Sequence, residues 1–136
     1  MIVSKFALRY PVSTIVGLHM FSGEILDHWQ KSSVEVYQGK INERVVCVWG
    51  IILPTTFSNS AYLWMAHTEE LGRHPFVFIR QSQIEIRKLL EVYPQIIGHA
   101  VIDNDKAKRW LRWLGAEFHT PVGNLHPFFI RRRTDD

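Results

Sequence analysis

Residues Gly98–Arg131, GHAVIDNDKAKRWLRWLGAEFHTPVGNLHPFFIR, are the part of this sequence that says most about its fold. The apolar run Ile96–Ile102 predicts a strand that leads into this stretch. Asp103 or Asn104 then predicts the start of a helix, because short polar side chains accept hydrogen bonds from the first backbone N–H groups of a helix. Gly115 is expected to end that helix.

A hairpin is expected to close the chain. Glu117–Val122 and Leu125–Arg131 are expected as its two strands, and Gly123–Asn124 between them suits a tight turn. Two rings near the end, Phe128 and Phe129, add apolar bulk to the second strand. The last third of the chain is therefore predicted as strand, helix and two strands.

The elements before this stretch complete a mixed α/β pattern. They are expected as one or two short helices in Tyr10–Lys31, strands at Ser32–Gln38, Val45–Leu53 and Ala61–Ala66, and a helix from Pro75 to about Val92. Gly39–Arg44 reads as a turn with Asn42 at the tip of a hairpin. This order predicts an α/β (α+β) fold with a mixed central sheet and helices on both faces.

Composition limits what the chain can be. Its 136 residues are 46% hydrophobic and no linker or repeat divides them, which predicts a single domain over residues 1–136. The net charge is only +3, so no strong field covers the whole protein. A single cysteine, Cys47, excludes an internal disulfide, and its apolar strand predicts an inert thiol in the core.

Four residues of the predicted last helix resemble a known family. Asn104, Ala107, Leu114 and Gly115 are similar to the asparagine, alanine and leucine-glycine in the last helix of GNAT acetyltransferases. The order of elements is similar from about Val34 onward, whereas the residue matches lie in the last third. The resemblance implies a GNAT-like sheet and, in active members, the use of acetyl-CoA.

The segment expected to bind the coenzyme departs from the family pattern. Active members carry an Arg/Gln-x-x-Gly-x-Gly/Ala loop, whose backbone N–H groups hold the pyrophosphate. Here His67–Pro75 reads HTEELGRHP, with Gly72 as its one glycine. We expect the adjacent Glu69 and Glu70 to repel a pyrophosphate, and Pro75 removes one N–H donor at the helix start.

A second departure concerns the acid that protonates the leaving thiolate. Many family members place a tyrosine in the last helix for this purpose, and the corresponding position here is Leu111. A leucine has no proton to give, and the neighbouring Trp110 and Trp113 are very poor acids. Together, the two departures disfavour ordinary acetyl transfer.

A narrower resemblance agrees with these losses. Gly98–Arg131 is similar to the end of internal virion protein A of podovirus-type phages, through Asn104, Leu111, Gly115 and Ala116–His119. That resemblance implies a non-catalytic virion or assembly protein without a cofactor, which acts through contacts with other phage or host proteins. It also implies synthesis in the bacterial host cytoplasm or a place inside the virion. The N-terminus does not resemble a signal peptide.

An acetyltransferase with an altered coenzyme loop is the first alternative. In that case Gly72, Arg73 and Asn104 would bind acetyl-CoA, and His67 or Glu69 would act as the general base. The competing interpretation of His67 and Glu69 is a polar loop at the end of a strand. Whether the chain is an enzyme is therefore left open.

The basic, aromatic helix is the basis of a second alternative. Lys106, Arg109, Arg112 and Trp113 could grip phosphates and stack on a base, as in an inhibitor or a nucleic-acid-binding protein. The competing interpretation is a core-packed helix with a solvated basic face. No metal site is expected, because the seven histidines include no pair at helical i, i+4 spacing and no H-E-x-x-H motif.

Overall fold

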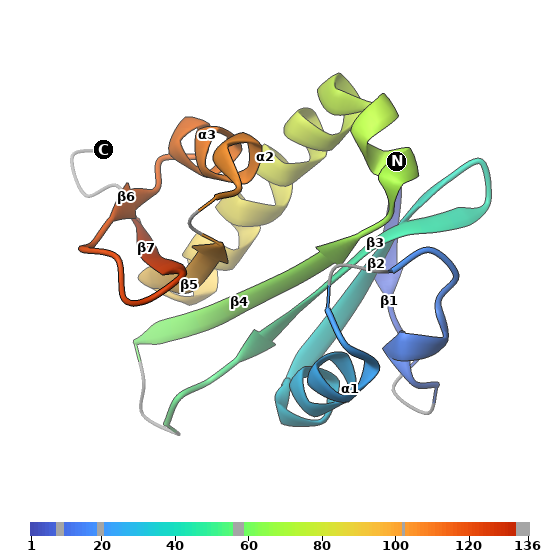
Figure 1. Ribbon diagram of the computed structural model, residues 1–136, viewed down its shortest axis with the longest axis horizontal. Coiled ribbons are helices and arrows are strands. Elements are labelled where there is room, and N and C mark those ends of the chain that lie inside the picture. The colour runs from blue at the N-terminus through green and yellow to red at the C-terminus, as the bar shows by residue number, and fades with distance from the viewer. Residues whose placement is uncertain (8–9, 19–20, 56–58, 102, 133–136) are drawn as a thin grey trace. The chain divides into compact units, whose positions relative to one another are not determined.

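The computed structural model describes residues 1–7, 10–18, 21–55, 59–101 and 103–132 (Figure 1). It contains two compact units: Met1–Leu53 with Leu63–Phe78, and Pro54–Tyr62 with Ile79–Asp136. One strand, Ser60–His67, contributes residues to both units. The single domain expected from the sequence stays a prediction.

The chain has the mixed α/β fold that the sequence predicts. Its elements are β1 (Ile2–Lys5), η1 (Val12–Thr14), α1 (Gly23–Ser32), β2 (Glu35–Ile41), β3 (Arg44–Ile52), β4 (Ser60–His67), η2 (Glu69–Arg73), α2 (Pro75–Val92), β5 (Gln95–Val101), α3 (Asp105–Trp113), β6 (Glu117–Phe118) and β7 (Leu125–Arg131), where η marks a 3-10 helix. The seven strands are ordered β1-β2-β3-β4-β5-β7-β6. The pairing of β4 with β5 is parallel, and those of β2 with β3 and of β5 with β7 are antiparallel.

Strand β3 is the buried centre of the first unit. Val46, Cys47, Val48 and Ile51 are each 0% exposed, so the strand is covered on both faces, as its continuous apolar run predicts. The Trp64 indole packs directly against the backbone of Gly50, and a Cβ atom at this position would collide with it. The sheet therefore needs glycine at this position.

The strand next to β3 packs against helices on both of its faces. Trp64 of β4 stacks on Trp29 of α1 with ring centroids 5.6 Å apart, and its Nε1 donates a 2.7 Å hydrogen bond to Ser33 Oγ. On the opposite face, Leu63 and Met65 belong to the hydrophobic cluster formed around residues of β3 and η2. The expected cover of helices on both faces is thus present within this unit.

In the second unit, the start of β4 and the end of the chain form a small sheet. Ser60–Tyr62 pair with Gln95–Ile97 in parallel, and β7 pairs with β5 along its whole length. Asn104 caps α3, since its Oδ1 accepts a 3.0 Å hydrogen bond from Ala107 N. Gly115, with φ of +96°, ends the helix in the left-handed conformation that favours glycine.

Three boundaries differ from the sequence-based expectations. Strand β1 was not predicted, and β2 runs on to Ile41, so that Asn42 and Glu43 alone form the turn, both with positive φ. Strand β6 covers only Glu117–Phe118, although Val122 and Leu125 form an isolated bridge nearer the turn. Ile102, expected to end β5, lies outside the described residues. Within the described ranges, no helix is long and apolar enough to cross a membrane.

Replacing Gly50 by alanine is expected to destabilise the fold. The added methyl group would overlap the buried Trp64 indole, and such overpacking costs about 1–3 kcal/mol. Urea unfolding followed by tryptophan fluorescence measures the loss. Gly23→Ala, at the start of α1, is the matched control, because the nearest atom to its added Cβ would be Ser13 Cβ at 3.4 Å. Equal stabilities of the two variants would contradict the packing argument.

Candidate functional site

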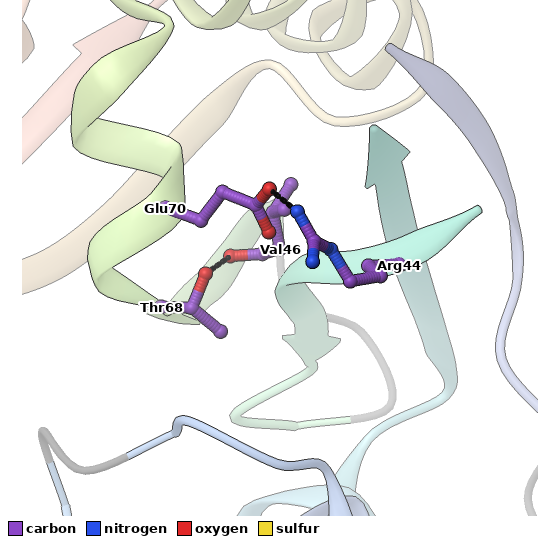
Figure 2. Close-up of polar contacts among 4 residues, drawn as sticks. All are labelled: Arg44, Val46, Thr68 and Glu70. Carbon is purple, nitrogen blue, oxygen red and sulfur yellow. Dashed lines mark hydrogen bonds and ion pairs between the residues drawn. The ribbon is translucent and has the colours of Figure 1, made fainter. Parts of the chain in front are cut away.

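The segment between β4 and α2 is held to the core at its first residue. Thr68 is 7% exposed, and its backbone N donates a 2.9 Å hydrogen bond to the carbonyl oxygen of Val46. The Thr68 hydroxyl donates to the same oxygen at 3.3 Å (Figure 2). Leu71, three residues later, is 3% exposed and joins the hydrophobic cluster of β3. Two anchors thus fix the path of η2, in which Glu69, Gly72 and Arg73 are exposed.

Glu70 forms an ion pair with Arg44, the first residue of β3 (Figure 2). The side chain of Glu70 is 19% exposed and that of Arg44 is 69% exposed. The pair places a positive charge next to one of the two carboxylates that are expected to repel a pyrophosphate. The expected repulsion of phosphate by two adjacent glutamates is therefore overstated, because Arg44 offsets one of them.

Gly72, Arg73 and the start of α2 form the exposed end of this segment. Gly72 and Arg73 are both exposed, and His74 N closes the turn by donating to Leu71 O at 3.0 Å. Pro75 occupies the first helical position, as the sequence predicts. The first turn of an 18-residue helix carries a partial positive charge, so an anion beside Arg73 is favoured there.

His67 is positioned by its own neighbour. The ring is half-buried, and its Nδ1 lies 3.0 Å from the carbonyl oxygen of Thr68. Because a carbonyl oxygen only accepts hydrogen bonds, Nδ1 carries the proton in this contact and Nε2 is left as the basic nitrogen of a neutral imidazole. Glu69, the other candidate base, is exposed at the start of η2.

Helix α3 of the second unit carries the remaining candidate residues. Asn104 uses its Oδ1 for the helix cap, and Leu111 is 5% exposed and packs in the core. Trp113 is 54% exposed, and the exposed cations on this helix are Lys106, Arg109 and Arg112. The Arg112 guanidinium lies 5.0 Å from the centroid of the Phe118 ring. Contact of this face with nucleic acid or a partner protein stays a prediction.

Sequence reasoning missed one pair of polar side chains in the second unit. The Tyr62 hydroxyl of β4 and Nδ1 of His99 on β5 are 3.0 Å apart. The residues are 37 positions apart, so no local motif signals their contact. Arg44 was missed for the same reason, since 26 positions separate it from Glu70.

Cys47 lies in the core of the first unit. The side chain is 0% exposed, and burial raises the pKa of the thiol to about 12. Among the residues that the structure describes, no group of three or more His, Cys, Asp or Glu residues could hold a metal ion.

The fold is that of the GNAT N-acetyltransferases. An IAA acetyltransferase from Bacillus cereus is similar over 96% of this chain and 99% of its own, with a TM-score of 0.74 and 10% identity. The ribosomal-protein-S18-alanine N-acetyltransferase from Escherichia coli is similar over 99% and 97%, with a TM-score of 0.68 and 13% identity. A Bacillus subtilis acetyltransferase in complex with CoA is similar over 82% and 85%, with a TM-score of 0.65 and 10% identity. No protein-family model matches the sequence, and no curated protein matches it.

These structural neighbours overturn the expectation of a non-catalytic virion or assembly protein. The solved structures that share the fold over nearly the full chain include acetyltransferases with different acceptors, such as spermidine and a ribosomal protein. Nothing among them supports the internal virion protein family in particular. The GNAT resemblance drawn from the last helix is confirmed for the fold, and the narrower phage resemblance is not supported.

Cys47 is expected to resist alkylation as long as the protein is folded. Iodoacetamide reacts with thiolates, and a thiol whose pKa is raised to about 12 stays protonated at mildly alkaline pH. Mass spectrometry should show no adduct on the native protein and one adduct per chain in denaturant. Rapid labelling of the native protein would contradict the buried position.

Proposed function

We propose that this protein is an acetyl-CoA-dependent N-acetyltransferase, which transfers the acetyl group of the thioester to an amine. The observation that carries the proposal is the likeness to acetyltransferases over almost the entire chain. One of the similar structures was solved with CoA, so this fold accommodates that coenzyme in at least one relative of the same architecture. The identity of the fold leaves the acceptor open, because one fold supports many substrates.

The segment after β4 supplies the groups proposed for the coenzyme phosphates. Arg73 is an exposed cation beside the start of α2, and Gly72 before it presents backbone without a side chain. The helix start adds its partial positive charge, although Pro75 offers no N–H. The Arg44–Glu70 ion pair keeps the nearby carboxylate compensated. Asn104 stays a further candidate, through the amide NH2 group, since its Oδ1 caps α3.

His67 is the proposed general base. The contact of Nδ1 with Thr68 O leaves Nε2 with a lone pair, which can accept the proton that the amine loses when its nitrogen attacks the thioester carbonyl. Glu69 is the alternative base. Glu69 is exposed at the start of η2, and the imidazole is preferred because histidine is the side chain that most often acts as a general base.

Binding of acetyl-CoA tests the proposal directly. Calorimetry with acetyl-CoA should detect binding, and Arg73→Ala should weaken it roughly tenfold or more, as expected for loss of a hydrogen bond to a charged group. Arg87→Ala, which removes an exposed cation of α2 away from this segment, is the matched control. Mass spectrometry with spermidine or with a peptide that begins with alanine should then reveal an acetylated product. Absence of both binding and product would refute the proposed function.

A single and a double variant test the part of Arg44 in coenzyme binding. Arg44→Ala should weaken the binding of acetyl-CoA several-fold, because Glu70 is then uncompensated and an exposed charge interaction is worth about 0.2–1 kcal/mol. Adding Glu70→Gln to Arg44→Ala should restore most of the affinity. Calorimetry at low and high salt makes the comparison, and the differences should shrink with added salt. A double variant as weak as Arg44→Ala would show instead that Arg44 contacts the coenzyme itself.

A further inference from the structure

Helix α3, in the second unit, has two contrasting sides. The buried and half-buried residues on one side recur at spacings of three and four, as on the core side of a helix; they are Ala107, Trp110, Leu111 and Leu114. The other side carries four exposed residues at the same spacings, which we call the basic face of α3: Lys106, Arg109, Arg112 and Trp113. The core side of the helix is therefore complete without the basic face.

The three cations of the basic face have no acidic partner within the described part of the chain. Asp105, the acid next to them in the sequence, lies 3.6 Å from Lys108, which is outside the basic face. Like charges three residues apart on a helix repel one another, so Lys106, Arg109 and Arg112 destabilise α3 as long as no anion lies between them. An anion that contacts all three would remove this repulsion.

Trp113 is the apolar member of the basic face. The residue is 54% exposed, whereas Leu111 on the core side is 5% exposed. A large ring left in water forgoes the stabilisation that burial gives, and charged side chains alone would keep a face solvated. Cations beside an exposed ring are the arrangement with which proteins hold single-stranded nucleic acid, because the cations contact phosphates and the bases stack on the ring.

Arg112 is held in place by the hairpin that follows the helix. Its guanidinium lies 5.0 Å from the centroid of the Phe118 ring on β6, and that ring is 4.6 Å from the ring of His126 on β7. Arg112 is nevertheless exposed, so its N–H donors stay accessible to an anion. A side chain that is already ordered loses less entropy when it binds a phosphate.

We propose that the basic face of α3 binds a single strand of nucleic acid, with Lys106, Arg109 and Arg112 on its phosphates and Trp113 stacked on an unpaired base. Lys106 and Trp113 are about 11 Å apart along the helix axis, at about 1.5 Å per residue, so the contact covers a short segment of strand. Three cations are fewer than the roughly 6–10 phosphate contacts typical of duplex binding. This binding goes beyond the proposed acetyltransferase function and does not depend on it.

The salt dependence of binding tests the part of the cations. Fluorescence anisotropy with labelled oligothymidylate or oligouridylate of about twelve nucleotides measures the affinity at several salt concentrations. The logarithm of the binding constant should fall with the logarithm of salt concentration with a slope of about −2, because each phosphate contact of a single strand contributes about −0.7. Arg109→Gln should reduce this slope to about −1.4. Arg87→Gln, which removes an exposed cation of α2 in the same unit, should leave it unchanged.

Substitution of Trp113 tests the stacking contact. Trp113→Ala should weaken binding about five-fold or more at every salt concentration and leave the slope unchanged, since the indole carries no charge. Trp113→Phe keeps an aromatic ring and should retain most of the affinity. Phe76→Ala removes an exposed ring of the first unit and should have no effect. Circular dichroism checks that each variant is folded, as expected for substitutions of exposed residues.

Each outcome decides one part of the proposal. A wild-type protein that binds neither oligonucleotide at low salt would overturn it, and so would tighter binding of a duplex of the same length. Unchanged affinity of Trp113→Ala would overturn the stacking contact. Polyglutamate that competes equally well, and that the same variants bind more weakly, would assign the face to an acidic protein partner instead. Oligonucleotide binding without binding of acetyl-CoA would support this proposal and count against the acetyltransferase function.

Discussion

The burial of strand β3 on both faces is the constraint on which the first unit depends. Its backbone polar groups cannot reach water, so neighbouring elements must supply their hydrogen bonds. The same elements must also pack closely against its side chains. Gly50 leaves room for the Trp64 indole, and the carbonyl oxygen of Val46 accepts both hydrogen bonds from Thr68. Arg44, at the start of the same strand, reaches Glu70. The segment proposed to bind phosphate is thus positioned by β3.

The charge of that segment shows why residue type alone was misleading. Two adjacent glutamates in the sequence predict a segment that repels anions. In the structure Arg44 offsets Glu70, and Arg73 lies exposed beside the start of α2. The sum of these charges is close to neutral, and the helix start then favours an anion. Repulsion is consequently a weak argument against a coenzyme, and the hypothesis of a non-catalytic scaffold loses one of its two supports.

The other support was the absence of a tyrosine on the last helix. Leu111 is indeed buried and chemically inert, so the observation itself holds. The leucine excludes a proton donor at this one position only, because a residue of another element could supply the acid. Loss of one residue from a family pattern is therefore weak evidence for loss of activity.

The sequence by itself determined the elements whose signals are local. The apolar run of β3, Pro75 at the start of α2, and the cap and stop of α3 at Asn104 and Gly115 were all predicted, because each depends on residues close together in the chain. Strand β1, which has few apolar residues, and the end of β2 were missed, since pairing with neighbouring strands rather than local pattern stabilises them.

Only the tertiary structure decided which polar residues meet. Arg44 with Glu70 and Tyr62 with His99 are 26 and 37 residues apart, and their contacts depend on strand register rather than on spacing in the sequence. Function could not be read from local signals either. The last third of the chain identified the GNAT fold correctly, but its motif serves capping and packing and therefore says little about chemistry. The sequence thus determined the architecture, and the folded arrangement decided which polar side chains lie within reach of one another.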